Sequence, residues 1–370
     1  MGLKSAVRKC GRILLPLTEL QVGAARQKLD LSPEEAAALL HAARPDRPCE
    51  IEGHHILAPA CDLQIVLPAY NAAPYLRACL DSVLQQQTAY TFEITAVDDG
   101  STDGTGEILD AYAAGDSRLR VLHQANGGIA RARNAGMQTL TGRYIMFVDA
   151  DDLLEPGAIQ TLLQKAYRLD ADVVEGGHTV FADGGRARST VRYRETEQPG
   201  LSQHRGQPWG RVIRAACFEH LQFPPGFEYE DSIIGCCLLP AAAAKYNIAA
   251  PVYRWRYHAG GITQTAKQSE KCLDTFYISL ALWDWYAAHF PLTEDFYRMM
   301  LRQLVLNQSR TAGMGEALQN SGFCLEREYC LRLFPQPPAL QGRYRLLDQA
   351  VRAGDRGNFR LVCSRWKWME

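Results

Sequence analysis

The sequence contains no long hydrophobic run. None of its segments approaches the roughly 18 consecutive apolar residues that a membrane-spanning helix needs. The longest apolar stretch near the N-terminus, residues 13–17, is interrupted by Pro16, and no small-residue cleavage site follows it. A transmembrane anchor and a cleaved signal peptide are both poorly supported, so we expect a cytoplasmic protein.

The sequence also lacks an excess of either charge. Lys and Arg total 40 against 41 Asp and Glu, which leaves a net charge of -1. Nucleic-acid binding draws its affinity from a basic surface that meets phosphates, so no nucleic-acid partner is expected. Any chemistry must therefore come from local clusters of polar residues.

The 11 cysteines do not form the pairs that bind zinc or build a disulfide framework. Their number is odd, Cys236 and Cys237 are adjacent, and no CxxC pair is present. Hydrophobic residues make up 47% of the chain and charged residues 22%, the composition of a folded globular protein. We expect buried thiols in a reducing cytosol rather than a secreted scaffold.

The hydrophobic pattern divides the chain into three parts. In residues 1–61, Ser32 followed by Pro33 and two acids predicts a helix that ends before Pro45, and residues 44–59 are predicted to form a linker. Residues 62–265 alternate between strand and helix patterns. Residues 266–370 are helical in pattern and rich in aromatic residues, which indicates a helical C-terminal region.

Within residues 62–265, short apolar runs predict strands at 63–67, 92–97, 119–123, 144–148 and 172–175. Apolar residues at helical spacing predict helices at 75–87, 104–114, 129–140 and 160–169. Strands that alternate with helices build right-handed βαβ units, so we expect an α/β fold with a mainly parallel sheet flanked by helices. Ligands of such sheets bind at the carboxyl ends of the strands.

Acidic residues directly follow two of these predicted strands. The second strand leads into Asp98 and Asp99, and the fourth leads into Asp149, Asp151 and Asp152. Carboxylates gathered in one crevice repel one another unless a cation or hydrogen-bond donors compensate. Asp149 and Asp151, separated by one residue at a turn, offer hard oxygen ligands that favour Mg²⁺ or Mn²⁺ over zinc. Such an ion can also hold a diphosphate and neutralise its developing charge.

Four motifs, in this order, resemble those of the family 2 glycosyltransferases. They are Pro68-Ala69-Tyr70-Asn71, the segment Val97 to Asp103, Asn126-Gly127-Gly128 with Ala132 to Gly136, and the segment Asp149 to Asp152. The resemblance covers about residues 62–265. It implies a GT-A (Rossmann-like) fold, a nucleotide-sugar donor, usually a divalent metal ion, and inversion at the anomeric carbon.

The resemblance also implies which residues contact the donor. Asp99 would hydrogen-bond the uracil edge of a uridine donor, Asp149 would lie near the ribose or the metal, and Asp151 would bind the metal directly. The implied donor-binding residues are Pro68, Ala69, Tyr70, Asn71, Asp99, Asn126, Gly128, Arg133, Asp149, Ala150, Trp209 and Arg256, and the implied metal ligands are Asp151, Asp149 and His258. Arg133 would support the nucleotide or the acidic turn, and a structural ion pair with one of the acids is equally open.

Glu230 and Asp231 resemble the family's Glu-Asp pair, in which the Asp acts as base. A sugar hydroxyl is a poor nucleophile, and a carboxylate within hydrogen-bond reach can take its proton as attack proceeds. The resemblance therefore implies that Asp231 is the general base of a single displacement, with Glu230 positioning it or the acceptor. The alternative is that both acids cap a helix beginning near Ser232.

Two further segments resemble parts of the family. Trp209 lies in a Trp-centred loop whose indole face suits a sugar ring, although a Trp is more often part of the core. Arg211 stands where the family usually has Lys, and either a phosphate or a structural role is open for it. Residues 253–263 resemble a flexible lid segment, in which Arg256 could meet the diphosphate and His258 the phosphate or metal. Solvated residues of an edge strand are the alternative.

These features lead us to expect an enzyme that moves a sugar from a nucleotide-sugar donor, with UDP as the favoured nucleotide, to a hydroxyl of a glycan or lipid-linked acceptor. A sugar nucleotidyltransferase is disfavoured because residues 69–74 lack the Gly, Arg and Lys that cradle a triphosphate. A non-catalytic scaffold protein with the same fold stays open. The basic N-terminal residues Lys4, Arg8, Lys9 and Arg12, with the basic aromatic run 359–368, suggest peripheral attachment at the inner face of the plasma membrane.

Overall fold

The computed structural model describes residues 21, 26–200, 206–258 and 269–368. The chain divides into two units: the sheet unit, Cys49–Gly261, and the helical unit, which joins Met1–Pro48 to Ile262–Glu370. The boundaries expected from the sequence, at residues 61 and 265, stay predictions. The basic N-terminal residues 4–12 and residues 259–263 of the lid-like segment lie outside the described residues.

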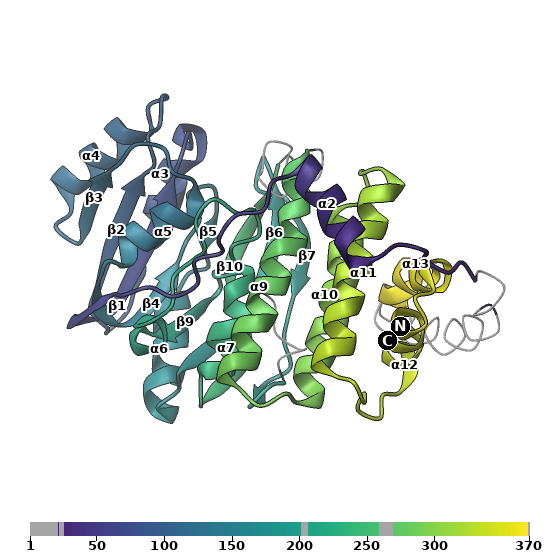
Figure 1. The fold of residues 1–370 in the computed structure, drawn as a ribbon. Coiled ribbons are helices and arrows are strands. Elements are labelled where there is room, and N and C mark those ends of the chain that lie inside the picture. Colours follow the sequence, from purple (N-terminus) through teal and green to yellow (C-terminus); the bar gives the residue numbers. More distant parts are fainter. Residues whose placement is uncertain (1–20, 22–25, 201–205, 259–268, 369–370) are drawn as a thin grey trace. The chain divides into compact units, whose positions relative to one another are not determined.

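The sheet unit alternates strands and helices over most of its length (Figure 1). Its strands are β1 (Ile56–Ala69), β2 (Phe92–Asp98), β3 (Leu119–His123), β4 (Thr139–Phe147), β5 (Leu153–Leu154), β6 (Val173–Ala182), β7 (Ala187–Val191), β8 (Thr196–Glu197), β9 (Arg211–Arg214) and β10 (Lys245–Tyr257). Its helices are α3 (Ala73–Leu84), α4 (Thr105–Gly115), α5 (Ile129–Met137), α6 (Ala158–Leu169) and the short α7 (Leu239–Ala241), with a 3-10 turn at Ala215–Phe218 and a π-helical turn at Ile234–Leu238.

The strands form one sheet in the order β3-β2-β1-β4-β9-β6-β10-β5, with β7 beside β6 and β8 beside β10. The block β3-β2-β1-β4 is parallel, and so is the pair of long strands β6 and β10. The four-residue strand β9 runs antiparallel to both β4 and β6 and joins the two blocks. The α/β fold with a mainly parallel sheet is therefore confirmed.

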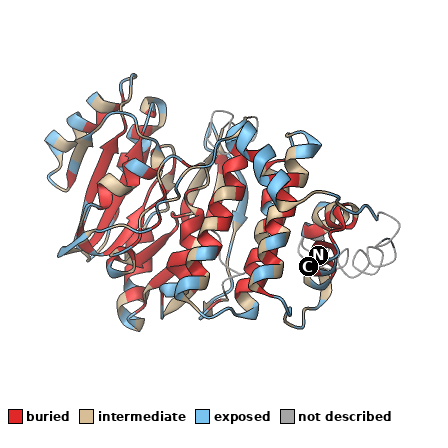
Figure 2. Cartoon of the chain, viewed as in Figure 1, coloured by how far each residue is buried: buried red, intermediate tan, exposed pale blue. Residues whose placement is uncertain are grey.

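The central strand and the first helix have the burial that their sequences predict. The run Leu63–Leu67 of β1 is buried on both faces, and Figure 2 shows the sheet buried along most of its strands. The amide of Gln64 is fully buried, but it donates to the Gly136 carbonyl and accepts from the Thr141 backbone. In α3 the buried residues are Leu76, Cys79, Leu80 and Val83, one face of a helix. Burying each such side chain contributes about 1.5–3 kcal/mol.

Two predicted boundaries are wrong. The predicted linker overlaps β1, which begins at Ile56, and the predicted helix 129–140 overlaps β4, which begins at Thr139. Both differences come from strand pairing. Ile56 pairs with Thr139 and Leu57 with Leu140, so backbone hydrogen bonds between β1 and β4 continue each strand beyond its apolar run. Residues 56–60 are exposed, so no hydrophobic signal marks them as strand.

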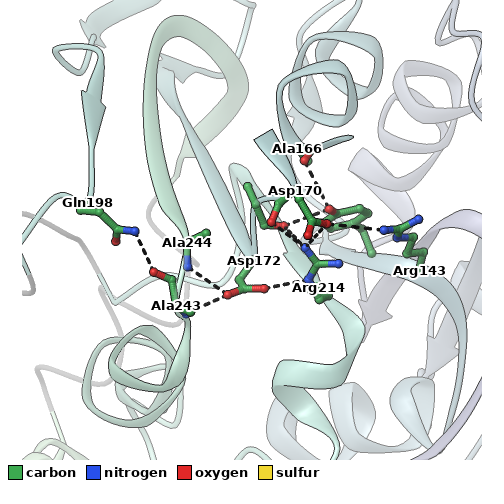
Figure 3. A network of polar contacts seen from close by, with 10 residues as sticks. Arg143, Ala166, Asp170, Asp172, Gln198, Arg214, Ala243 and Ala244 are labelled. Atoms are coloured by element: carbon green, nitrogen blue, oxygen red, sulfur yellow. Dashed lines mark hydrogen bonds and ion pairs between the residues drawn. The ribbon is translucent and has the colours of Figure 1, made fainter. Parts of the chain in front are cut away.

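A polar network holds the edge of the sheet at which β6 begins (Figure 3). The Asp172 carboxylate accepts from Nε of Arg214 at 2.7 Å and from the backbone amides of Ala243 and Ala244 at 2.7 and 3.0 Å. Arg214 also donates to Asp170 at 2.8 Å. Burial alone would raise the pKa of Asp172, but the hydrogen bonds from Ala244 and Arg214 outweigh it and lower that pKa.

In its described residues the helical unit contains α2 (Pro33–Ala43), α9 (Asp274–His289), α10 (Glu294–Arg310), α11 (Glu316–Leu333), α12 (Gly342–Arg352) and α13 (Arg356–Arg365), with 3-10 turns at Glu270–Leu273 and Trp366–Trp368. The predicted start of α2 is confirmed, because Ser32 and Glu35 form a reciprocal capping box. The helix packs against α11. The backbone amide of Gln27 donates to Asp355 at 3.0 Å, which ties the first described segment to the start of α13.

Two aromatic residues near the C-terminus, Phe359 and Trp366, belong to the core of the helical unit. Phe359 is 1% exposed and Trp366 is 9% exposed. These two rings are therefore occupied by packing rather than presented to a membrane. No helix in the described part of the chain combines the length and the apolar character that crossing a membrane requires.

The ten cysteines among the described residues are all free thiols. Six of them are buried. The expectation of buried thiols is therefore met by these six, whereas the other four are partly exposed.

Candidate functional site

The loops that follow β1, β2 and β4 lie at one edge of the sheet. Ala69, the last residue of β1, is in register with Asp98 at the end of β2, and Val66 is in register with Phe147 at the end of β4. Because these strands are parallel, their carboxyl ends meet at the same edge. The sequence motifs predicted to bind a donor are therefore neighbours in the fold.

The first two loops are tied together by Asn71. Its side-chain oxygen accepts from the backbone amide of Thr102 at 2.9 Å, and its own backbone amide donates to the Ser101 hydroxyl at 3.1 Å. Asn71 has φ 47°, a left-handed conformation that asparagine tolerates better than most residues. The neighbouring Tyr70 is 52% exposed and open to a ligand, whereas Pro68 and Ala69 are buried at the end of β1.

Asp99 organises the loop before α5. Its two carboxylate oxygens each accept from a backbone amide at 2.8 Å, one from Gly127 and one from Gly128. The side-chain amide of Asn126 donates a hydrogen bond to the backbone carbonyl of Asp99 at 3.0 Å. Gly100, at φ +72°, lets the two loops approach, since an added Cβ would lie 2.6 Å from the Asn126 nitrogen. The role of Asp99 at the uracil edge stays a prediction beside this structural one.

Arg133 connects the acidic turn after β4 to the Glu230-Asp231 segment. Its guanidinium donates to Asp149 at 2.9 Å and to Glu230, and its side chain is only 3% exposed. The ring of Phe223 lies beneath it, with the guanidinium carbon 5.3 Å from the ring centre. The sequence left open whether Arg133 forms a structural ion pair. In the structure it forms two, one with Asp149 and one with Glu230.

The pKa values of these groups reflect burial and mutual charge. Burial raises the pKa of Glu230 to about 7, and Asp231 adds to this while Arg133 opposes it. Burial likewise raises the pKa of Asp149, against the opposing effect of Arg133. Asp231 lies close enough to influence both carboxyls and Arg133. The two acidic segments therefore share one electrostatic environment, centred on a buried guanidinium.

Asp151 faces the end of β10. Its carboxylate lies 2.8 Å from Nε2 of His258, and its backbone carbonyl accepts from Nε of Arg256 at 2.7 Å. The backbone amide of Arg256 donates to the buried Asp152 at 2.6 Å. The structure therefore brings together Asp151, Arg256 and His258, which come from two distant segments of the sequence.

No group of three or more potential metal-ligating His, Cys, Asp and Glu side chains gathers among the described residues. The pair formed by Asp151 and His258 nevertheless fits a metal that is held partly by its substrate. Mg²⁺ and ions like it commonly use one or two protein carboxylates and complete their shell with water and phosphate oxygens. One oxygen of Asp149 already accepts from Arg133, which leaves its other oxygen for such an ion.

Trp209 lies beside this turn rather than within the acidic cluster. Its ring stacks on Tyr253 at 4.6 Å, and the Tyr253 hydroxyl accepts from the backbone amide of Asp149 at 3.1 Å. Ala150 is buried between the acids of the turn. Arg211 is completely buried and pairs with Glu175 at 3.1 Å, so its role is structural.

Three residues of the site were not predicted from the sequence. Tyr253 supports the turn through its hydroxyl, and Phe223 lies under Arg133. Tyr75 contacts two predicted residues at once, because its ring centre lies 5.1 Å from that of His258 and 4.7 Å from the guanidinium carbon of Arg256. A Tyr that follows Pro74 at a helix start carries no local signal of such a role, since its partners lie on β10.

Comparison with known proteins agrees with this geometry. The family model described as glycosyl transferase family 2 matches residues 64–221, which contain the first three loops and the acidic turn. The chain belongs to glycosyltransferase family 2. This family 2 chain is 47% identical over 117 residues to the glycosyltransferase GlyG of Streptococcus pneumoniae serotype 4, covering 31% of this chain and 38% of GlyG.

Solved structures show the fold of the family 2 chain to be GT-A. S. aureus TarS 1-349, in complex with UDP-GlcNAc, superposes with a TM-score of 0.64 at 18% identity, covering 82% of this chain and 91% of that one. A mannosyltransferase from Pyrobaculum calidifontis, in complex with GDP-Man and Mn²⁺, gives a TM-score of 0.50 at 14% identity, covering 96% and 98%. The chain spans 33% to 45% of the length of the first three curated relatives that it matches.

Proposed function

We propose that this chain transfers a sugar from a nucleotide-diphosphate sugar to a hydroxyl of an acceptor, with inversion at the anomeric carbon. The observation that carries the proposal is the Arg133 bridge, which holds the donor-side turn and the Glu230-Asp231 segment at one site. The bound UDP-GlcNAc of TarS supports a UDP-sugar as donor. The acceptor is a glycan or a lipid-linked sugar.

In this proposal the two acidic segments have separate roles. Asp231 takes the proton of the acceptor hydroxyl as that oxygen attacks the anomeric carbon, and the nucleoside diphosphate leaves from the opposite face. Glu230 is occupied by Arg133, so it positions the segment instead of acting as the base. A single displacement of this kind needs no protein nucleophile.

The leaving diphosphate needs positive charge, and Asp151 and His258 would hold the ion that supplies it. A bound Mn²⁺ or Mg²⁺ neutralises charge that develops on the diphosphate. The Mn²⁺ in the mannosyltransferase complex supports a divalent ion here. Arg256, held between the rings of Tyr75 and Phe181 at 4.7 and 4.6 Å, adds a fixed guanidinium beside the same turn.

The donor experiment measures nucleotide release and sugar transfer separately. The full chain is incubated with a panel of nucleotide sugars and Mn²⁺, and released nucleoside diphosphate is quantified. Asp231→Asn should keep donor affinity in calorimetry while transfer falls by about 10²–10⁴-fold, the range that general base catalysis contributes. Glu107→Gln, an exposed acid of α4, is the matched control and should behave as the parent chain. Normal turnover in Asp231→Asn would exclude it as the base.

The metal experiment uses Asp151→Ala and His258→Ala. Each should weaken Mn²⁺-dependent donor binding in calorimetry, because each removes one of the two side chains that would hold the ion. Unchanged metal affinity would remove the residue from the ligand set. A chain that binds donor but releases no nucleoside diphosphate with any sugar of the panel would be a binding protein, and the proposed transfer would be wrong.

The hypothesis of membrane attachment rests on the basic N-terminal residues, because two of the C-terminal aromatic rings proposed to contact the membrane are buried in the helical unit. We keep peripheral binding to an anionic membrane as part of the proposal for a lipid-linked acceptor. Flotation of the full chain with vesicles containing an anionic phospholipid tests it. Failure to float at low salt would contradict it.

A further inference from the structure

Four aromatic rings follow one another beside the acidic turn, and we call them the aromatic track: Tyr253, Trp209, Trp255 and Tyr257. Tyr253, Trp255 and Tyr257 alternate along β10, so they share one face of the strand. Trp209 lies nearly parallel to Tyr253, at 9° and 4.6 Å, and to Trp255, at 16° and 6.5 Å. Trp255 and Tyr257 are 6.4 Å apart between ring centres.

The track is continuous with the proposed site. At its inner end the Tyr253 hydroxyl accepts from the Asp149 backbone, and the backbone of Trp209 bridges to Phe147 at the end of β4. At its outer end Tyr257 directly precedes His258, the partner of Asp151. Exposure rises from 0% at Tyr253 to 37% at Tyr257. The rings therefore lie alongside the acidic turn, and they become more exposed toward Tyr257.

The chemistry of these rings suits a sugar ring. A pyranose has a face of C–H groups that packs on an aromatic ring, while its hydroxyls stay hydrated around the edge. Tyr and Trp combine an apolar face with a polar edge, as such a ligand requires.

The outer end of the track is basic. The guanidinium carbon of Arg188 lies 4.3 Å from the centre of the Tyr257 ring. Arg188 is exposed, and among the described residues its side chain forms no ion pair. The exposed Arg186, Arg192 and Arg194 flank the same strand, β7, together with the acids Asp183, Glu195 and Glu197. A ligand on the track therefore meets positive charge at its far end.

We propose that the aromatic track is the acceptor subsite, and that the acceptor is a glycan chain of at least two rings with a carboxylate or phosphate group that faces Arg188. One ring of the chain stacks on Trp255 and the next on Tyr257. This inference rests on the proposed function, because the terminal hydroxyl of the chain must reach Asp231. In this proposal Trp209 lines the path of the acceptor and does not bind the donor.

Binding is tested on the full chain without donor, so that it does not depend on turnover. The probes are cello-oligosaccharides as neutral chains, oligouronates as carboxylate chains and glucan oligosaccharide phosphates, each with one to four rings. Tryptophan fluorescence and saturation-transfer NMR report binding. Affinity should rise by about three- to ten-fold for each stacked ring up to two, as expected for ring stacking. The acidic chains should bind more tightly at low salt than the neutral ones, and the better acidic series identifies the substituent.

Variants assign the binding to the track. Tyr257→Ala, at an exposed ring, and Trp255→Leu should abolish the gain in affinity with chain length, whereas Tyr257→Phe should keep it. Arg188→Gln should remove the preference for acidic chains. Trp285→Leu, a partly buried Trp on α9, is the matched control and should leave binding unchanged. Melting curves of each variant check that it is folded.

The outcomes separate this inference from the proposed function. Length-dependent binding that the track variants abolish, without any transfer, would support the track and contradict the transferase proposal. Transfer to a glycan whose affinity is independent of chain length, or unaffected by Tyr257→Ala and Trp255→Leu, would overturn the track and leave the transferase proposal standing. No binding by any probe would also overturn it.

Discussion

Replacing Arg133 by Met would remove the single cation that the structure places between Asp149 and Glu230. Breaking a buried ion pair by deleting one partner costs about 3–5 kcal/mol, because the other charge stays buried without compensation. Here one substitution leaves two carboxylates, Asp149 and Glu230, without their cation. The side chain of Arg133 is 3% exposed, so solvent screens little of the lost ion-pair energy. We expect the melting temperature to fall by about 6–20 °C, from that penalty and the usual response of a domain of this size.

The penalty should depend on pH in a defined direction. The pKa of Glu230 is about 7 in the parent chain, and Arg133 is the group that keeps burial from raising it further. Above pH 7 the parent ionises Glu230 beside Arg133, whereas the Arg133→Met chain must keep Glu230 protonated. Its free energy of unfolding then falls by about 1.4 kcal/mol per pH unit while that of the parent stays level. The difference should be about 2 kcal/mol larger at pH 8.5 than at pH 6.

Urea unfolding followed by circular dichroism at the two pH values measures this difference. Arg131→Met is the matched control, since Arg131 lies two residues earlier on α5 and is exposed. Exposed substitutions of this kind change stability by about 0.5 kcal/mol or less. A penalty for Arg133→Met below about 1 kcal/mol, or one that is equal at both pH values, would refute the reasoning from burial and charge.

Three further predictions concern other parts of the sheet unit. Tyr75→Leu should weaken Mn²⁺-dependent donor binding in calorimetry, because its ring contacts Arg256 and His258; Tyr75→Phe should not, and equal effects of both would contradict a role for the ring. Asp99→Asn should cost about 1–3 kcal/mol in thermal unfolding, since an amide group would face two backbone donors; an unchanged melting temperature would argue against the anchor. Asp172→Asn should flatten the loss of stability on acidification. The lowered pKa of Asp172 means that its contribution is present above about pH 4 and is lost as pH falls toward its pKa in the folded chain, so identical acid unfolding curves would count against it.

Local pattern was sufficient for the parts of the fold whose partners are close in sequence. The apolar spacing of α3, and the Ser32 cap with Pro33 and two acids at the start of α2, predicted both helices, because each signal lies within one or two turns. The sheet class followed from the alternation of such elements. The exposed first half of β1 was missed, because its strand conformation comes from pairing with β4 and not from burial.

The site was predictable as a set of motifs but not as an arrangement. Arg133 and Glu230 are 97 residues apart, so their ion pair has no local signal. The motifs carried by the family resemblance identified both residues, yet they left Arg133 open between a ligand and a structural role. Tyr75 and Tyr253 act through contacts with other elements, and nothing in their own sequence neighbourhood distinguishes them from core residues.

The bond between Gln27 and Asp355 has a consequence for the order in which the chain can fold. The two residues are 328 positions apart, with the sheet unit between them. At a synthesis rate of 5–20 residues per second, the N-terminal segment leaves the ribosome about 15–65 s before its partner exists. During that time α2 lacks α11, and the apolar side chain of Leu40 has none of its core neighbours from residues 272–276. The sheet unit can complete its fold first, and the helical unit closes after it.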